Sequence, residues 1–127
     1  MTSPPGTFRV LVVDDEPLIR WSVAETLGDA GHEVTEAPDA ASTMRSLATA
    51  PAPDVVLLDY RLPDSHDLTL LAGVRRLAPS AAVVMMTAFG ENDVADRAEA
   101  LGAYRVIDKP VDMRELDAIV RAAAASH

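Results

Sequence analysis

The sequence contains no cysteine, which excludes disulfides, thiolate metal sites and cysteine nucleophiles. Its first residues show no basic run followed by an apolar stretch, so no signal peptide is visible. No apolar run approaches the ~20 residues that a helix needs to span a bilayer. We therefore expect a cytoplasmic protein without a membrane segment.

Basic residues are also scarce, with 11 Lys and Arg against 20 Asp and Glu and a formal net charge of -9. A nucleic-acid-binding surface needs clustered Lys and Arg, so direct binding of nucleic acid is not expected. The acidity instead suits a cation. The length of 127 residues, 49% of them hydrophobic, suits one compact domain. We expect a flexible N-terminal tail over residues 1–7 and one folded domain over residues 8–125.

Short apolar runs predict the strands of a parallel sheet. The runs at 10–13, 55–58 and 83–86 are apolar throughout and rich in β-branched residues, which is typical of strands buried on both faces. Residues 33–37 and 104–107 mix apolar with polar or charged side chains. We expect these two weaker runs at the edges of the sheet.

Segments with helical spacing separate these runs. Pro17 suits the first turn of the first helix and Gly31 its end, while Asp39 and Asp112 suit the N-caps of the second and fifth helices. The apolar stripes lie at 19–30, 40–48, 70–77, 94–101 and 116–123. A strand and a helix repeated five times predict an α/β domain with one parallel sheet, helices on both faces and right-handed crossovers.

Polar residues follow four of the five predicted strands. Asp14 and Asp15 follow the first strand, Asp59 the third, Thr87 the fourth and Lys109 the fifth. In open α/β sheets, ligands bind beyond the carboxyl ends of the strands, at the point where the strand order reverses. The strand order 2-1-3-4-5 makes the first and third strands neighbours and would gather these side chains at one edge.

The acidic members of this group suit a divalent cation. Three carboxylates within a few ångströms repel one another, and a hard cation with oxygen ligands relieves that repulsion. Mg²⁺, or Mn²⁺ in its place, takes one or two carboxylates, keeps several waters and binds phosphate oxygens. We expect Asp15 and Asp59 as direct ligands and Asp14 as a ligand through water. The backbone carbonyl of Arg61 would supply a further oxygen.

The same group suits phosphoryl transfer onto Asp59. Aspartate can form an acyl phosphate, and in-line transfer mainly needs positioning and charge neutralisation. Lys109 would bring a second positive charge to the phosphoryl oxygens, and the Thr87 hydroxyl would donate to another of them. Asp59, Lys109 and Thr87 are therefore the candidate catalytic residues.

Four motifs in order, each at a strand end, resemble the response regulator receiver domain of two-component signal transduction over about residues 8–123. The motifs are VVDDEP at 12–17, LLDYRLPD at 57–64, MTA at 86–88 and KP at 109–110. The resemblance implies a flavodoxin-like (βα)5 doubly wound parallel sheet and a cis peptide bond between Lys109 and Pro110. It also implies these roles: phosphoacceptor at Asp59, Mg²⁺ pocket at Asp14 and Asp15, switch hydroxyl at Thr87 and phosphate contact at Lys109.

The resemblance further implies partners. A sensor histidine kinase would donate the phosphoryl group, and the phosphorylated form would control an output partner or domain. Such a chain is not an enzyme, because it promotes only its own phosphorylation and dephosphorylation. Residues 15–21 and 86–90 look most like receivers of enhancer-binding transcriptional activators.

A homodimer is expected through the fourth helix, fifth strand and fifth helix, a face that often makes dimers in the family. The alternative is scattered solvated charge. The charged residues in question are Asp96, Arg97, Arg105, Asp108, Arg114, Asp117 and Arg121.

The sequence departs from the family pattern at two places. His66 and Asp67 stand where most members carry an acidic residue and glycine, so Asp67 either adopts a left-handed conformation or caps the next helix. Val106 stands where many members place an aromatic switch, for which Tyr104 is an imperfect substitute. These departures motivate an alternative, a receiver-like interaction module that works without phosphorylation. An aspartate-nucleophile phosphatase is disfavoured, because that class needs an acid at the position of Arg61.

Three further side chains are open to ordinary structural interpretations. His32 is expected on the surface of a turn, and His66 in an exposed loop rather than in a proton shuttle. Trp21 either marks a partner face or is half-buried on its helix.

Overall fold

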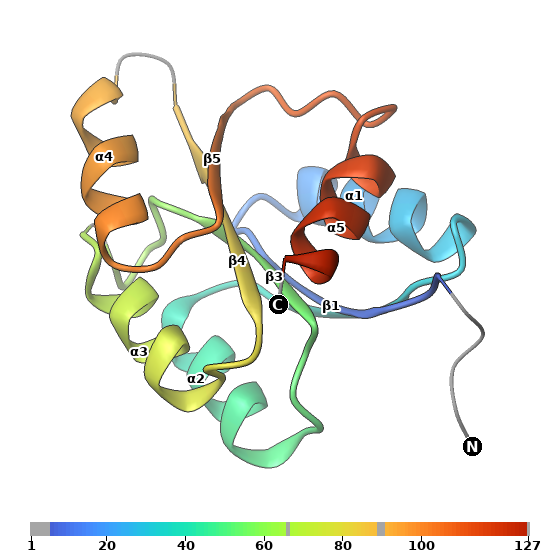
Figure 1. Ribbon diagram of the computed structural model, residues 1–127, viewed down its shortest axis with the longest axis horizontal. Coiled ribbons are helices and arrows are strands. Elements are labelled where there is room, and N and C mark those ends of the chain that lie inside the picture. Colours follow the sequence, from blue (N-terminus) through green and yellow to red (C-terminus); the bar gives the residue numbers. More distant parts are fainter. Residues whose placement is uncertain (1–5, 66, 89–90, 127) are drawn as a thin grey trace.

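The structure is a computed structural model that describes residues 6–65, 67–88 and 91–126. Figure 1 shows a central sheet with helices on both sides. Most of the predicted N-terminal tail and the predicted loop position of His66 lie outside the described residues. In the described part of the chain, no helix has the length and apolar character needed to cross a membrane.

Strands and helices alternate along the described chain. The strands are β1 (Arg9–Val13), β2 (Glu33–Ala37), β3 (Val55–Asp59), β4 (Ala82–Thr87) and β5 (Arg105–Asp108). The helices are α1 (Pro17–Asp29), α2 (Ala40–Thr49), α3 (Thr69–Leu77), α4 (Asn92–Ala100) and α5 (Leu116–Ala125). All strand pairs are parallel, in the order β2-β1-β3-β4-β5, which confirms the predicted flavodoxin-like fold.

The three central strands are buried because both faces of the sheet are covered. Along β1, Leu11 and Val13 face the core shared with α2, α3 and α4, whereas Val10 and Val12 face the core shared with α1 and α5. The same grouping of helices is visible in Figure 1. This two-sided burial explains why β1, β3 and β4 are apolar along their length. The polar residues in these strands are Arg9 at the start of β1 and Asp59 and Thr87 at the ends of β3 and β4. β2 and β5 are edge strands with mixed burial, as predicted.

Most predicted helix ends are confirmed. Pro17 is the first residue of α1, and Gly31 follows that helix at a φ of 97°, a left-handed conformation that glycine adopts without strain. Asp39 caps α2 through a reciprocal pair of hydrogen bonds with Ser42. The peptide bond before Pro110 is cis.

The predicted cap of the last helix is wrong. Asp112 accepts a hydrogen bond from the backbone N–H of Arg114 at 2.9 Å, within a turn that precedes α5. The N-cap position belongs to Glu115, whose side chain makes no capping hydrogen bond. Asp67 does not adopt a left-handed conformation, because no described residue other than glycine has a positive φ. Its carboxylate accepts the N–H of Thr69, the first residue of α3, although the N-cap position itself belongs to Leu68.

His32 lies in the interior and not on the surface of a turn, so its sequence interpretation is wrong. Its Nδ1 accepts a hydrogen bond from the N–H of Phe8 at 3.1 Å, and its Nε2 lies 2.7 Å from Asp117 Oδ1. Because Nδ1 accepts, the neutral ring carries its proton on Nε2 and donates it to Asp117. The imidazole also stacks on Phe8. The hydrogen bond from His32 lowers the pKa of Asp117, and the hydrogen bond and charge of Arg121 lower it further.

The His32 cluster includes two charged residues of the face near α5, Asp117 and Arg121. Asp117 and Arg121 were expected on the dimer surface, yet Arg121 donates to Asp117 and to the carbonyl of Gly6. Arg121 therefore attaches Gly6 to α5, and Asp117 links α5 to His32, while both side chains remain partly exposed. Trp21, by contrast, is exposed on α1 and not half-buried.

We expect the His32→Phe substitution to lower the free energy of unfolding by about 1–3 kcal/mol, because it keeps an aromatic ring but leaves the Phe8 N–H without its acceptor. Urea unfolding measures the loss, and Glu25→Gln on the exposed side of α1 is the control. In an Asp117→Asn background the loss is expected to shrink, since one of the two hydrogen bonds is already weakened. Equal stability of His32→Phe and wild type would contradict this assignment.

Candidate functional site

The site lies at the carboxyl edge of the sheet, where the strand order reverses. Val13 of β1 pairs with Leu58 of β3. Asp14 and Asp59 are the next residues along the two strands, so they lie side by side. Thr87 ends β4 next to β3, and Lys109 directly follows β5. Four chain segments that are distant in sequence therefore meet at one place, as the sequence pattern predicts.

Lys109 forms two ion pairs at the centre of this site. Its Nζ lies 2.8 Å from Asp59 Oδ2 and 3.0 Å from Asp14 Oδ2. Asp14 is 1% exposed and Asp59 6% exposed, so both carboxylates are nearly removed from water. Buried carboxylates at this spacing need a cation, and in the structure the ammonium group of Lys109 supplies it.

The electrostatics of the site follow from this burial. Burial raises the pKa of Asp59, as does the neighbouring Asp14, while the hydrogen bond and charge of Lys109 oppose the rise. Burial lowers the pKa of Lys109, but its contacts with the two carboxylates outweigh burial and raise that pKa overall. The site therefore favours the charged form of Lys109 and disfavours the charged form of Asp59.

Three carboxylates form a group that fits a divalent metal ion. One oxygen from each of Asp14, Asp15 and Asp59 lies within 4.8 Å of the others. Asp15 is exposed, so the group opens to solvent on one side and can accept ligands that retain water. A set of oxygen donors with an open side is the kind of site that Mg²⁺ takes in proteins.

Backbone and side-chain donors hold these acids in place. Asp14 Oδ1 accepts the N–H of Glu16 at 2.9 Å, and Arg20 donates to the Asp14 carbonyl at 2.7 Å. The N–H of Arg61 lies 3.3 Å from Asp59 Oδ1, which brings the Arg61 backbone to the site. Arg20 was not singled out from the sequence, because its position on α1 becomes informative only once α1 lies beside β1 and β2.

Thr87 is buried at the end of β4. Its hydroxyl donates to Asp108 Oδ1 at 3.5 Å, the upper limit for a hydrogen bond, and its carbonyl accepts the N–H of Lys109 at 2.8 Å. The hydroxyl is therefore weakly held in this state, although the backbone beside it is well anchored.

Tyr104 does not lie near Thr87. Its N–H donates to the carbonyl of Val83, which is four residues before Thr87 on β4 and so roughly 13 Å away along the strand. Val106 pairs with Met85 and is half-buried against the core. The described residues thus place no β5 aromatic side chain level with the threonine.

Sequence reasoning missed one ion pair next to the site. Arg61 Nε lies 2.6 Å from Glu91 Oε1, and the guanidinium group also lies over the ring of Tyr60. Glu91 stands just before α4 and not at a strand end, so a search of strand ends does not reach it. The hydrogen bond and charge of Glu91 raise the pKa of Arg61.

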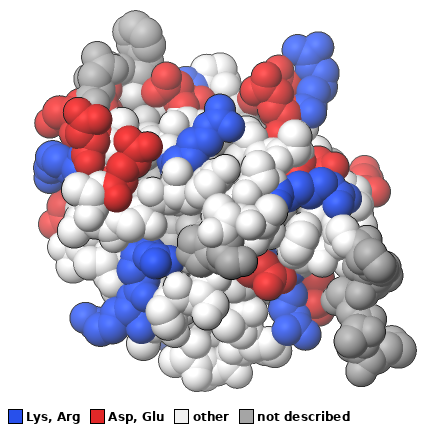
Figure 2. All heavy atoms as spheres, viewed as in Figure 1, with Lys and Arg blue, Asp and Glu red and all other residues white. Residues whose placement is uncertain are grey.

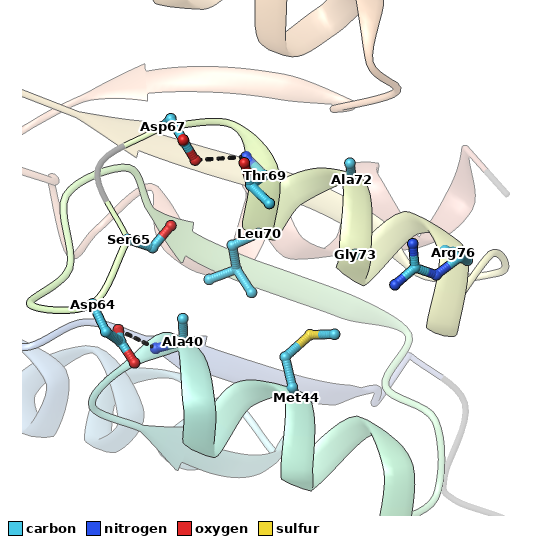
Figure 3. A pocket seen from close by; sticks show the side chains of 10 residues that line it. All are labelled: Ala40, Met44, Asp64, Ser65, Asp67, Thr69, Leu70, Ala72, Gly73 and Arg76. Atoms are coloured by element: carbon cyan, nitrogen blue, oxygen red, sulfur yellow. Dashed lines mark hydrogen bonds between the residues drawn. The ribbon is translucent and has the colours of Figure 1, made fainter.

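A hollow lies between α2 and α3, away from the residues at the carboxyl edge of the sheet. Its volume is about 760 Å³, and Met44, Leu70 and Gly73 form its apolar part (Figure 3). The two carboxylates at its rim have structural partners, because Asp64 accepts the N–H of Ala40 and Asp67 that of Thr69. None of the residues at the carboxyl edge of the sheet lines this hollow, so it is not the site of the chemistry.

The fold is a doubly wound parallel sheet, and buried aspartates and a lysine lie where its strand order reverses. These features define a class of α/β protein with an acidic site that suits a cation. The family model described as the response regulator receiver domain matches residues 10–121. The chain therefore belongs to the response regulator receiver domain family of two-component systems.

Individual relatives agree with this membership. The chain is 36% identical over 118 residues to the DNA-binding transcriptional regulator NtrC of Escherichia coli K12, covering 93% of this chain and 25% of that protein. NtrX from Brucella abortus superposes with a TM-score of 0.87 at 36% identity, covering 94% of this chain and 27% of NtrX. The isolated receiver domain of that NtrX gives a TM-score of 0.83 over 99% of its own length. The chain thus spans about a quarter of the NtrC relative and resembles the receiver domains of NtrC-type regulators.

Proposed function

We propose that the chain accepts a phosphoryl group on Asp59 from a sensor histidine kinase, with Mg²⁺ or Mn²⁺ bound, and then changes conformation. The observation that carries this proposal is the position of Lys109 Nζ, 2.8 Å from Asp59 and 3.0 Å from Asp14. A cation held between two buried carboxylates is already in place to contact the oxygens of an incoming phosphoryl group.

The chain's own residues would act as follows. An oxygen of Asp59 attacks phosphorus, the bond from phosphorus to the donor histidine nitrogen breaks, and that nitrogen keeps the electron pair. Lys109 moves its hydrogen bonds to the phosphoryl oxygens. Thr87 gives up its long bond to Asp108 and donates to another phosphoryl oxygen.

Asp14, Asp15, Asp59 and the carbonyl of Arg61 would hold the metal ion. When bound, the ion supplies positive charge that offsets the repulsion between the carboxylates and the phosphoryl group. The fit rests on the donors, which are hard oxygens with one side open to water.

The biological role follows from the relatives. We infer that the chain is not an enzyme acting on other substrates, and that it controls transcription through an output partner or domain, as the name of NtrC says of that protein. A homodimer through α4, β5 and α5 would use the charged residues of that face, namely Asp96, Arg97, Arg105, Asp108, Arg114, Asp117 and Arg121. Within the chain, Asp117 also contacts His32 and Arg121 contacts Gly6. Figure 2 shows both acidic and basic side chains on the drawn face, with a small group of basic side chains at its lower left.

The direct test is incubation with Mg²⁺ and acetyl phosphate, followed by intact-mass measurement. We expect one added phosphoryl group per chain, and its loss from the spectrum when a chelator replaces Mg²⁺. A wild-type protein that gains no mass would overturn the proposal in favour of an interaction module that works without phosphate. Repeated release of phosphate from phosphomonoesters would instead indicate a phosphatase.

A further inference from the structure

The pair formed by Arg61 and Glu91 joins the two segments that flank the phosphoacceptor. Arg61 follows Asp59 by two residues, and Glu91 follows Thr87 by four. Since β3 and β4 are adjacent, both segments leave the sheet at the edge where the site lies. The 2.6 Å contact between Arg61 Nε and Glu91 Oε1 therefore spans from one side of the site to the other.

The two side chains of this ion pair differ in their exposure to solvent. Its side chain is only 13% exposed, while that of Arg61 is 63% exposed. Its second oxygen, Oε2, is buried and has no hydrogen-bond partner among the described residues. A carboxylate in this position depends on Arg61 for neutralisation, because the unpaired oxygen already costs free energy.

Glu91 is also connected to the threonine at the end of β4. Its N–H lies 3.4 Å from the carbonyl of Ala88, the residue after Thr87, and Glu91 immediately precedes the first residue of α4. A contact that holds Glu91 therefore acts within four residues of Thr87, whose hydroxyl leaves Asp108 in the function proposed above.

We propose that the Arg61–Glu91 pair is a latch that favours the unphosphorylated form and slows phosphorylation of Asp59. This proposal rests on the function proposed above and concerns the regulation of the same site. Glu91 is a positioning residue, because it contacts Arg61 and touches none of the reacting atoms. A contact that restrains only one of two conformations shifts the balance between them by its own strength.

The test compares labelling rates with acetyl phosphate and Mg²⁺ for wild type and Glu91→Gln. We expect Glu91→Gln to label about three- to fivefold faster, the factor that loss of one part-exposed ion pair gives. The control is Asp93→Asn, which removes the 3.7 Å pair with Arg97 on the same helix without reaching the site.

The outcomes separate the latch from the function on which it rests. Labelled wild type with an unchanged rate in Glu91→Gln overturns the latch alone, as does an equal increase in Asp93→Asn. Unlabelled wild type overturns the proposed function and the latch with it. Thermal unfolding of each variant is measured in parallel, because a purely structural pair would lower the midpoint without changing the labelling rate.

Discussion

Replacing Lys109 with methionine is expected to lower the free energy of unfolding by about 3–5 kcal/mol near neutral pH. Methionine preserves the length and much of the volume of the side chain but removes the charge. Asp14 and Asp59 would then be two buried carboxylates without their shared cation. Chemical denaturation of both proteins without divalent ions measures the difference.

The pH dependence of that loss follows from the pKa of Asp59. Burial already raises this pKa, and removal of Lys109 raises it further. An acid with a raised folded-state pKa contributes stability that is fully present below its unfolded pKa of about 3.9 and is lost as the pH rises through the folded value. The deficit of Lys109→Met should therefore be small near pH 4 and grow toward about pH 7.

Two comparisons make this prediction specific. Mg²⁺ should restore more stability to Lys109→Met than to wild type, because the ion replaces the missing charge between the carboxylates. Arg9→Met removes an exposed ion pair with Glu33 and should change stability little, since solvent screens it. A deficit that is equal at both pH values, or unaffected by Mg²⁺, would contradict the central position of Lys109.

Substitution of Asp59 with asparagine is expected to abolish phosphorylation while leaving the fold intact. Asparagine has nearly the same shape but cannot form an acyl phosphate. Lys109 keeps its 3.0 Å contact with Asp14, so no buried charge loses its only partner. Labelling with acetyl phosphate, followed by peptide mapping, measures the effect, and Asp96→Asn on the exposed side of α4 is the control.

The same variant should be at least as stable as wild type near neutral pH. Because the folded-state pKa of Asp59 is raised, ionised Asp59 reduces stability above that pKa, and neutral asparagine removes this cost. The gain should increase from about pH 4 toward neutrality. Labelling of Asp59→Asn at the wild-type rate, or on another aspartate, would show that the phosphoacceptor lies elsewhere.

Local sequence patterns were sufficient for the fold and for the centre of the site. Runs that are apolar at every position require two covered faces, which selects a parallel sheet, and helical stripes between them leave few topologies. Once β1 and β3 are neighbours, residues directly after their ends must lie together. The meeting of Asp14, Asp59 and Lys109 therefore follows from strand order and from the position of each residue at a strand end.

Contacts between side chains far apart in sequence were decided only by the packed structure. The sequence around His32 predicts a residue on a turn, because nothing in it indicates a contact with α5. The packing of α5 beside α1 brings Asp117 within 2.7 Å of His32 and buries the ring. The Arg61–Glu91 contact depends in the same way on where α4 begins relative to the loop after β3. Strand and helix periods specify which face a residue occupies, whereas such pairs depend on the relative placement of whole elements, which no short stretch of sequence encodes.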